Sequence, residues 1–431
     1  MDLLAIALGD DFWLSFAQKL FQPLLLFFYL GFLIPILKVP YTFPKQVYQG
    51  ITLYLLVAIG WHGGEELAKM SGEGFMEALG FSAIGFCANI VIGLTAYFML
   101  RKMTRMRRVD CATVGGYYGS DSAGTFLTCV GVLMVMGYKE IGYMPVLLAV
   151  METPGCLVCL YQIARLRRQG MDKLGNMPDE PGYIAPGAEE ALDENEALSE
   201  DVEAHGAARR AGGTAVAAPG AVRSTIDTAG HGGSGHGGHG PKKHGARAGG
   251  FDLAIIHEVF FNPGLYFLFG GIFIGLVAGK LFIPYGKENV IAAENLLFVT
   301  MMHGILCLFL LEMGITACER LRDLKQAGWG FVVFGILAPN LFAIFGLALA
   351  HLYSLFLGRP FDLPTYALFA VLCSAASYIA VPAVQHMAIP EASPTLPLAA
   401  SLGLTFTWNV TLGIPIYIEI ATYLMKVFPS G

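Results

Sequence analysis

A single carboxylate lies in the middle of an otherwise apolar stretch of the chain. Asp121 belongs to the segment Gly115-Gly116-Tyr117-Tyr118-Gly119-Ser120-Asp121-Ser122-Ala123-Gly124-Thr125-Phe126. A carboxylate at the centre of a membrane span costs about 2.5–3.5 kcal/mol, so it is retained for a partner. Its charge excludes it as a direct ligand of an anion and favours Na+ or H+. Hydroxyl groups of Ser120, Ser122 and Thr125, with nearby carbonyls, would complete an oxygen shell. The alternative is that Asp121 caps a half-helix and the serines satisfy backbone groups, and the two roles are compatible.

A second polar segment, Cys373-Ser374-Ala375-Ala376-Ser377-Tyr378-Ile379-Ala380-Val381-Pro382, lies in another apolar stretch. Pro382 removes a backbone donor and clashes with the carbonyl four residues earlier. The four glycines between Gly115 and Gly124 each disfavour a helix by roughly 1 kcal/mol relative to alanine. We therefore expect both stretches to unwind at these segments, facing protein or a polar cavity. Free amides at a half-helix N-terminus would favour an anion, and free carbonyls would suit a cation.

Other polar residues in apolar stretches leave their roles open. Glu152 and Glu312 either line a pathway or form hydrogen bonds between helices. Cys156-x-x-Cys159 has the spacing of a redox or zinc motif, but it lies in an apolar stretch without nearby histidines. We interpret these thiols as buried packing groups.

The composition defines the class of protein that carries these segments. The chain has 431 residues, 55% of them hydrophobic and 14% charged, with a formal net charge of −6. Soluble globular domains carry roughly 25% charged residues. A charge content near half of this excludes a soluble enzyme with a charged surface, and the net negative charge argues against a nucleic-acid binder. The chain is predicted to be an all-α integral membrane protein.

About 20 largely apolar residues are needed to cross a bilayer as a helix. This rule predicts ten spans, five before and five after a polar insert. In the first half they lie near 12–37, 46–62, 77–100, 112–136 and 143–164, and in the second near 258–283, 295–316, 328–356, 364–386 and 395–425.

Positive charge sets the orientation of these spans. Basic clusters follow spans three, five and seven, at 101–108, 165–168 and 320–325, and ten spans place all of them on one side. That side is predicted to be the cytoplasm, so both termini lie outside it. The loop after span two, with Glu65, is acidic and is expected outside.

The two halves match weakly but in the same order. Pairs of similar motifs begin at Gln22-Pro23 and Asn262-Pro263, Gly60 and Gly314, Gly80 and Gly330, and Pro145 and Pro397. Five spans per copy is an odd number, so the second copy must be inverted, as in many secondary transporters. We predict two inverted five-helix repeats with broken helices at the repeat centre. The domains would be 1–169, the first repeat; 170–250, a disordered acidic and Gly/His-rich cytoplasmic linker; and 251–431, the second repeat.

The segment 115–126 resembles the cyanobacterial sodium-dependent bicarbonate transporter family of the SbtA type. The run at 374–383 and the Phe-Gln-Pro and Phe-Asn-Pro openings resemble it as well. The resemblance implies a homotrimer in the cell inner membrane, each protomer having a core domain with crossing broken helices and a gate domain. It implies high-affinity Na+/bicarbonate symport serving a carbon-concentrating mechanism, without enzymatic activity or an organic cofactor. It also implies inhibition by a PII-like regulatory trimer on the cytoplasmic face.

Mapped onto this chain, the resemblance places the substrate and ion site where spans four and nine face each other. Na+, the co-transported ion, would bind at Asp121 with Ser120, Ser122 and Thr125. The residues expected to bind bicarbonate are Gly119, Ser120, Ser122, Ser374, Ala375, Ala376 and Ser377.

Two alternatives remain open at this point. One is Na+-coupled transport of another small anion, and the other is a membrane sensor that binds an anion without flux. An intramembrane enzyme is disfavoured, because the sequence has no His-Glu-x-x-His or Gly-x-Ser-x-Gly motif. The sequence does not fix the number of Na+ ions: one per bicarbonate makes transport electroneutral, whereas a second also draws on the membrane potential.

Overall fold

The computed structural model describes residues 17–138, 142–185, 257, 262–324, 328–378 and 380–428. These residues form helices joined by turns and short loops, without a strand among them. Six of their helical stretches are long and apolar enough to cross a membrane, and the helices Pro23–Ile36 and Leu363–Ser374 are shorter and also apolar. The chain is therefore all-helical in its described part, with the composition of a multi-pass membrane protein.

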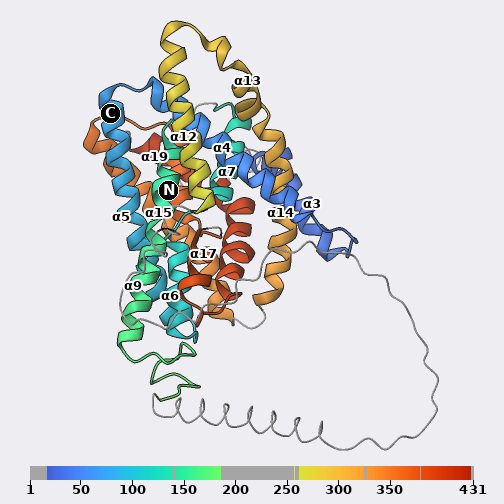
Figure 1. The fold of residues 1–431 in the computed structure, drawn as a ribbon, viewed down its shortest axis with the longest axis vertical. Helices are drawn as coiled ribbons and strands as arrows, with labels where there is room; N and C mark the ends of the chain where they lie inside the picture. The colour runs from blue at the N-terminus through green and yellow to red at the C-terminus, as the bar shows by residue number, and fades with distance from the viewer. Residues whose placement is uncertain are drawn as a thin grey trace, which may run out of the picture.

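One group of helices, here called the gate group, contains α3 (Pro23–Ile36), α4 (Lys45–Lys69), α12 (Pro263–Phe282) and α14 (Met302–Asp323). The short helices η1 (Ile283–Tyr285), η2 (Glu288–Val290), α13 (Ala292–Asn295) and η3 (Leu296–Thr300) connect α12 to α14. The main packing pairs are α4 with α12 and α3 with α14. Figure 1 shows this group along one side of the molecule.

Small residues allow the gate helices to approach closely. A Cβ atom at Gly64 of α4 would lie 2.2 Å from the carbonyl oxygen of Ile272 in α12, and one at Gly31 of α3 would lie 1.9 Å from that of Leu311 in α14. Spacing of small residues by four positions, as in Gly60 and Gly64, is typical of closely packed membrane helices.

The second group, here called the core group, contains the two polar segments. Its helices from the first half are α5 (Gly72–Met103), α6 (Arg108–Tyr118), α7 (Ala123–Val135), α8 (Met144–Met151) and α9 (Pro154–Arg168). Those from the second half are α15 (Trp329–Leu357), α16 (Leu363–Ser374), α17 (Ala380–Ala388), α18 (Leu396–Leu398), η5 (Ala399–Phe406), η6 (Asn409–Gly413) and α19 (Ile414–Val427). The long helices α5 and α15 pack against α6 and α16 respectively.

The structure differs from the predicted spans in several places. Helix α4 continues to Lys69, so Glu65 and Glu66 lie in its last turns rather than in a loop. The predicted fifth span is interrupted at Glu152 and Thr153, between α8 and α9. The predicted tenth span contains two π-helical segments, η5 and η6.

The predicted linker at 170–250 differs at its beginning. Residues 170–185 form turns that pack against the start of α6, with Asp172 and Asn176 buried. The Asp172 carboxylate accepts hydrogen bonds from the backbone amides of Leu174, Asn176 and Ile184. The rest of the predicted linker and the first part of the predicted first span lie outside the described residues.

Candidate functional site

The predicted break in span four lies between α6 and α7. Helix α6 ends at Tyr118, and α7 begins at Ala123 with Ser122 as its N-cap. The Ser122 hydroxyl oxygen accepts the backbone amide of Thr125 at 3.3 Å and its hydroxyl at 3.1 Å. The first amides of a helix, here those of Ala123 and Gly124, have no intrahelical acceptor, and the Tyr378 hydroxyl group lies beside Gly124. The predicted site residues of this segment are all buried.

The predicted break in span nine lies between α16 and α17 and meets the first one directly. The backbone amide of Ser377 donates to the carbonyl oxygens of Tyr117, at 2.8 Å, and Ser120, at 3.0 Å. The amide of Ala375 donates to Val371 at 3.0 Å. The two segments therefore cross in contact, but the amides of Ala375 and Ser377 are already engaged. Of the groups expected to bind the substrate, these two amides are not free in this conformation.

A kink between α8 and α9, which the sequence reasoning missed, packs against the break in span four. The Ser120 hydroxyl donates to the backbone carbonyl of Glu152 at 2.5 Å. A Cβ atom at Gly155 would lie 2.6 Å from both the carbonyl carbon of Gly119 and the amide nitrogen of Ser120. The signal in the sequence was the Thr153-Pro154-Gly155 run, because proline favours the first turn of a new helix.

Asp121 has the environment expected of a cation ligand. Its side chain is buried, and no donor among the described residues forms a hydrogen bond with either carboxylate oxygen. The carboxyl groups of Asp121 and Glu152 are near enough for their charges to interact. A buried carboxylate without hydrogen bonds is costly unless a positive charge balances it. In the described part of the chain, no three His, Cys, Asp or Glu residues gather as a transition-metal site would require.

Tyr378 is a further side chain at the crossing that the sequence reasoning did not select. Its hydroxyl group lies against α7, where a Cβ atom at Gly124 would be 1.9 Å from it. Its ring packs edge-on against Phe406, with centroids 5.7 Å apart, and Phe406 packs against Phe28 of the gate group at 5.9 Å. Tyr378 thus connects the polar segments to the boundary between the two groups of helices.

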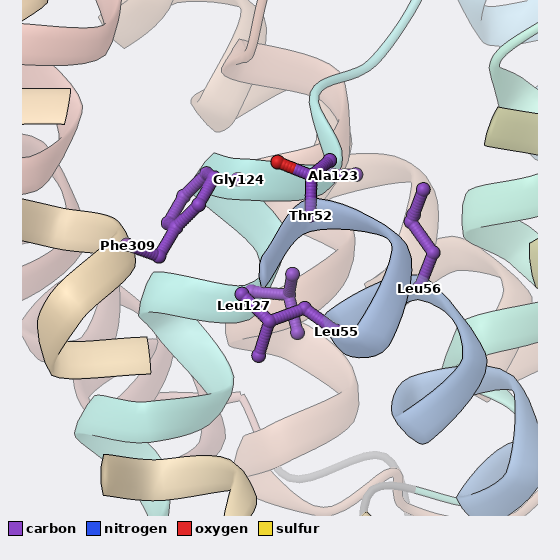
Figure 2. A pocket seen from close by; sticks show the side chains of 7 residues that line it. All are labelled: Thr52, Leu55, Leu56, Ala123, Gly124, Leu127 and Phe309. Atoms are coloured by element: carbon purple, nitrogen blue, oxygen red, sulfur yellow. The ribbon is translucent and has the colours of Figure 1, made fainter. Parts of the chain in front are cut away.

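A small apolar pocket lies at this boundary, beside the first turn of α7. Figure 2 shows its lining residues, which come from α7, α4 and α14: Ala123, Gly124, Leu127, Thr52, Leu55, Leu56 and Phe309. Ala123 and Gly124, in the first turn of α7, therefore line a space between the core and gate groups.

Span ten supports the break in span nine. The Asn409 side-chain amide in η6 donates to the carbonyl oxygen of Ser374 at 3.2 Å, and its carbonyl oxygen accepts the Tyr417 hydroxyl at 2.9 Å. Tyr118 and Thr405 pair their hydroxyl groups at 2.5 Å. π-Helical segments often occur at functional sites because they reorient side chains. No periodic pattern of residues predicts them.

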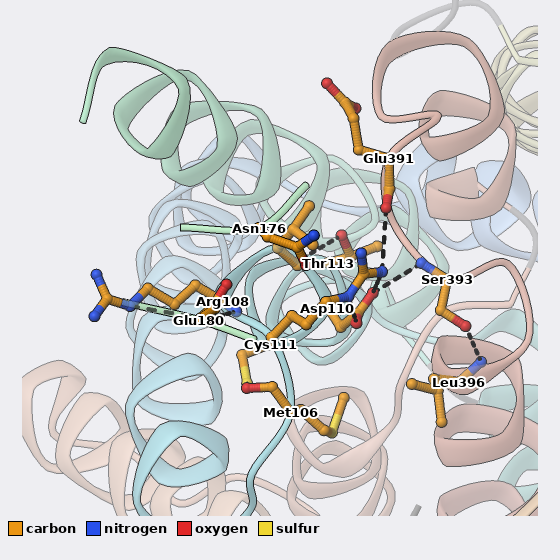
Figure 3. Close-up of polar contacts among 12 residues, drawn as sticks. Met106, Arg108, Asp110, Cys111, Thr113, Asn176, Glu180, Glu391, Ser393 and Leu396 are labelled. Atoms are coloured by element: carbon orange, nitrogen blue, oxygen red, sulfur yellow. Dashed lines mark hydrogen bonds and ion pairs between the residues drawn. The ribbon is translucent and has the colours of Figure 1, made fainter. Parts of the chain in front are cut away.

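A polar cluster at one end of the core group fixes the start of α6 (Figure 3). The Asp110 carboxylate accepts hydrogen bonds from the Arg107 guanidinium and from the backbone amide of Ser393. Arg107 also donates to the carbonyl oxygen of Glu391, whose carboxylate pairs with Arg167 at 2.8 Å. Two of the predicted cytoplasmic basic clusters, at 101–108 and 165–168, therefore meet at one end of the molecule.

A comparison with protein families matches residues 23–422 to the Na+-dependent bicarbonate transporter superfamily. A comparison with curated protein sequences found no match. Because the family match covers most of the chain, the protein belongs to the Na+-dependent bicarbonate transporter superfamily. Membership assigns it a transporter role rather than an enzymatic one.

Proposed function

We propose that this member of the Na+-dependent bicarbonate transporter superfamily couples the entry of Na+ to the uptake of bicarbonate, binding both at the crossing of its broken helices. The observation that carries the proposal is Asp121. Its two carboxylate oxygens are buried without a hydrogen-bond partner among the described residues, in the segment that also carries Ser120 and Ser122. Na+ is the cargo that would satisfy them, with Thr125 nearby.

Bicarbonate is placed at the first turn of α7. The amides of Ala123 and Gly124 and the positive end of the helix dipole favour an anion there. The hydroxyl groups of Ser374 and Ser377, across the crossing, complete the binding groups. The bound Na+ then offsets the repulsion between Asp121 and the anion, which makes binding of the two ions cooperative and accounts for coupling.

The pocket between the groups indicates how access would alternate. The gate group presents Thr52 and Phe309 to the first turn of α7. We propose that movement of the core group against the gate group exposes the site to one side of the membrane and then to the other.

An inverted repeat accounts for the packing of the helices. The repeat matches Gly60 with Gly314, and the Pro23 and Pro263 openings align Gly31 with Gly271. In the structure, Gly60 of α4 contacts Gly271 of α12, and Gly314 of α14 contacts Gly31 of α3. Equivalent residues thus make equivalent contacts, as a two-fold relation between the repeats requires. We propose ten spans with both termini outside the cytoplasm, which this arrangement and the basic clusters support.

The resemblance to the SbtA type extends the proposal to physiology. We propose high-affinity uptake in the inner membrane that serves a carbon-concentrating mechanism, by a homotrimer under the control of a PII-like trimer. Measurement of the molar mass in detergent by light scattering, with and without the regulator, tests the assembly.

The experiment that tests the transport proposal is uptake of radiolabelled inorganic carbon at alkaline pH in a host without its own bicarbonate transport. We expect uptake with external Na+ and not with K+, and weaker apparent bicarbonate affinity in Ser374→Ala and Ser377→Ala. Unlabelled formate, nitrite and acetate serve as competitors. Stronger uptake of one of these anions would identify a transporter of another small anion, and binding without flux would identify a sensor.

A further inference from the structure

Glu152 lies at the kink between α8 and α9, beside the crossing of the two breaks. Ser120 links the kink to the crossing, because its carbonyl oxygen accepts the Ser377 amide and its hydroxyl group donates to the Glu152 carbonyl oxygen. Gly155, three residues after Glu152, packs directly on the backbone of Gly119 and Ser120. The backbone of Glu152 is therefore held beside the same segment that carries Asp121.

Two carboxyl groups consequently share one buried region. Glu152 is 4% exposed and Asp121 is 1% exposed, and their charges interact. Neither forms an ion pair with a Lys, Arg or His side chain among the described residues. Like charges buried together destabilise each other unless a cation or a proton neutralises them. One Na+ at Asp121 would leave the second negative charge unbalanced.

We propose that Glu152 binds a second Na+, so that the loaded site holds two Na+ ions for each bicarbonate. The inference rests on the proposed function and sets its stoichiometry. The two carboxylates and two Na+ ions sum to zero charge, so that the bicarbonate binds to a neutral rather than a negative site. Each transport cycle then moves one net positive charge inward.

This stoichiometry changes how strongly the substrate is concentrated. With one Na+, a tenfold Na+ gradient supports a tenfold bicarbonate gradient, whereas two ions support about a hundredfold gradient. Net charge movement adds a factor of about 50 at 100 mV, inside negative. The second carboxylate is thus the feature that connects uptake to the membrane potential.

Equilibrium binding of radioactive Na+ to the purified full chain counts the ions without requiring transport. We expect two Na+ ions per wild-type chain and one in Glu152→Gln. Glu152→Asp keeps the charge and should bind two ions, with the second bound more weakly. Glu65→Gln is the matched control, because Glu65 is a buried carboxylate near the end of α4 that accepts a hydrogen bond from Asn295, which a glutamine can also accept. A wild-type count of one, or a count of two that Glu152→Gln does not change, overturns the assignment.

Uptake into proteoliposomes with a potential set by K+ and valinomycin gives the second readout. Wild-type uptake should depend on Na+ with a Hill coefficient above 1 and should increase when the inside is negative. Glu152→Gln should lower the coefficient to 1 and lose the response to potential. Na+-dependent wild-type uptake that ignores the potential overturns the second ion and leaves the proposed function intact, whereas absence of Na+-dependent uptake contradicts the proposed function itself.

Discussion

Replacing Gly155 with alanine perturbs the site through the packing of α9 on the span-four break, without removing any proposed ligand. The new Cβ atom would lie 2.1 Å from the carbonyl oxygen of Gly116 and 2.6 Å from the Ser120 amide nitrogen. Ordinary contacts begin at 3.4 Å. The backbone of α9 or of the span-four break must therefore move by about 1.3 Å, because both contacts are with backbone atoms rather than flexible side chains.

Overpacking of this kind costs about 1–3 kcal/mol. Part of the strain is relieved by displacing Ser120 and, with it, the neighbouring Asp121. If that displacement costs the site about 1.4 kcal/mol, the Na+ concentration at half-maximal uptake rises tenfold. We expect Gly155→Ala to unfold at a lower temperature and to need at least tenfold more Na+, with uptake measured in proteoliposomes over a series of Na+ concentrations.

Gly270→Ala in α12 is the matched control. A Cβ atom there meets nothing within 4 Å. It should keep the wild-type Na+ dependence and gain up to about 1 kcal/mol of helix stability. If Gly155→Ala keeps the wild-type Na+ affinity and thermal stability, the contact with α9 does not hold the span-four break in place.

Three further perturbations follow from the same contacts. Gly124→Ala should impair uptake because its Cβ atom would overlap the Tyr378 hydroxyl, and the double variant with Tyr378→Phe should recover part of the activity; no recovery would contradict this contact as the cause. Asp110→Asn should lower the free energy of unfolding by about 1.5–3 kcal/mol, because it removes the charged acceptor of Arg107; thermal unfolding measures it, and an unchanged midpoint contradicts it. Deleting residues 190–245 should leave basal Na+-dependent uptake intact, and its loss would show that this part of the chain takes part in transport.

The helices and the two polar breaks could be predicted because each has a local cause. The length of an apolar stretch defines a span. Gly119 interrupts the helix of span four, and the proline-containing 373–382 segment interrupts that of span nine. The polar residues of these segments are selected by the cost of burying them, which needs no knowledge of the fold. These local signals selected Ser120 and Ser377, whose backbones meet at the crossing, and Asp121, whose role as an ion ligand stays a prediction.

The remaining features depend on contacts between distant parts of the chain. The Ser377 amide donates its hydrogen bonds to the carbonyl oxygens of Tyr117 and Ser120, about 260 residues earlier in the chain. No local sequence pattern predicts this pairing. From the sequence alone, Tyr378 is indistinguishable from a packing residue. Only the fold shows that its hydroxyl group lies beside Gly124. Asn409 belongs to a π-helical segment that depends on packing against span nine.

In the proposed mechanism, Asp121 binds the Na+ that drives bicarbonate uptake. The most direct measurement is labelled bicarbonate uptake by purified wild type and Asp121→Asn in proteoliposomes, with either Na+ or K+ outside. Asparagine keeps the size of the side chain and removes its charge. We expect the wild type to take up bicarbonate with external Na+ and not with K+. A folded Asp121→Asn should show no uptake above background with either ion. Uptake by Asp121→Asn with the wild-type Na+ dependence would contradict this role of Asp121.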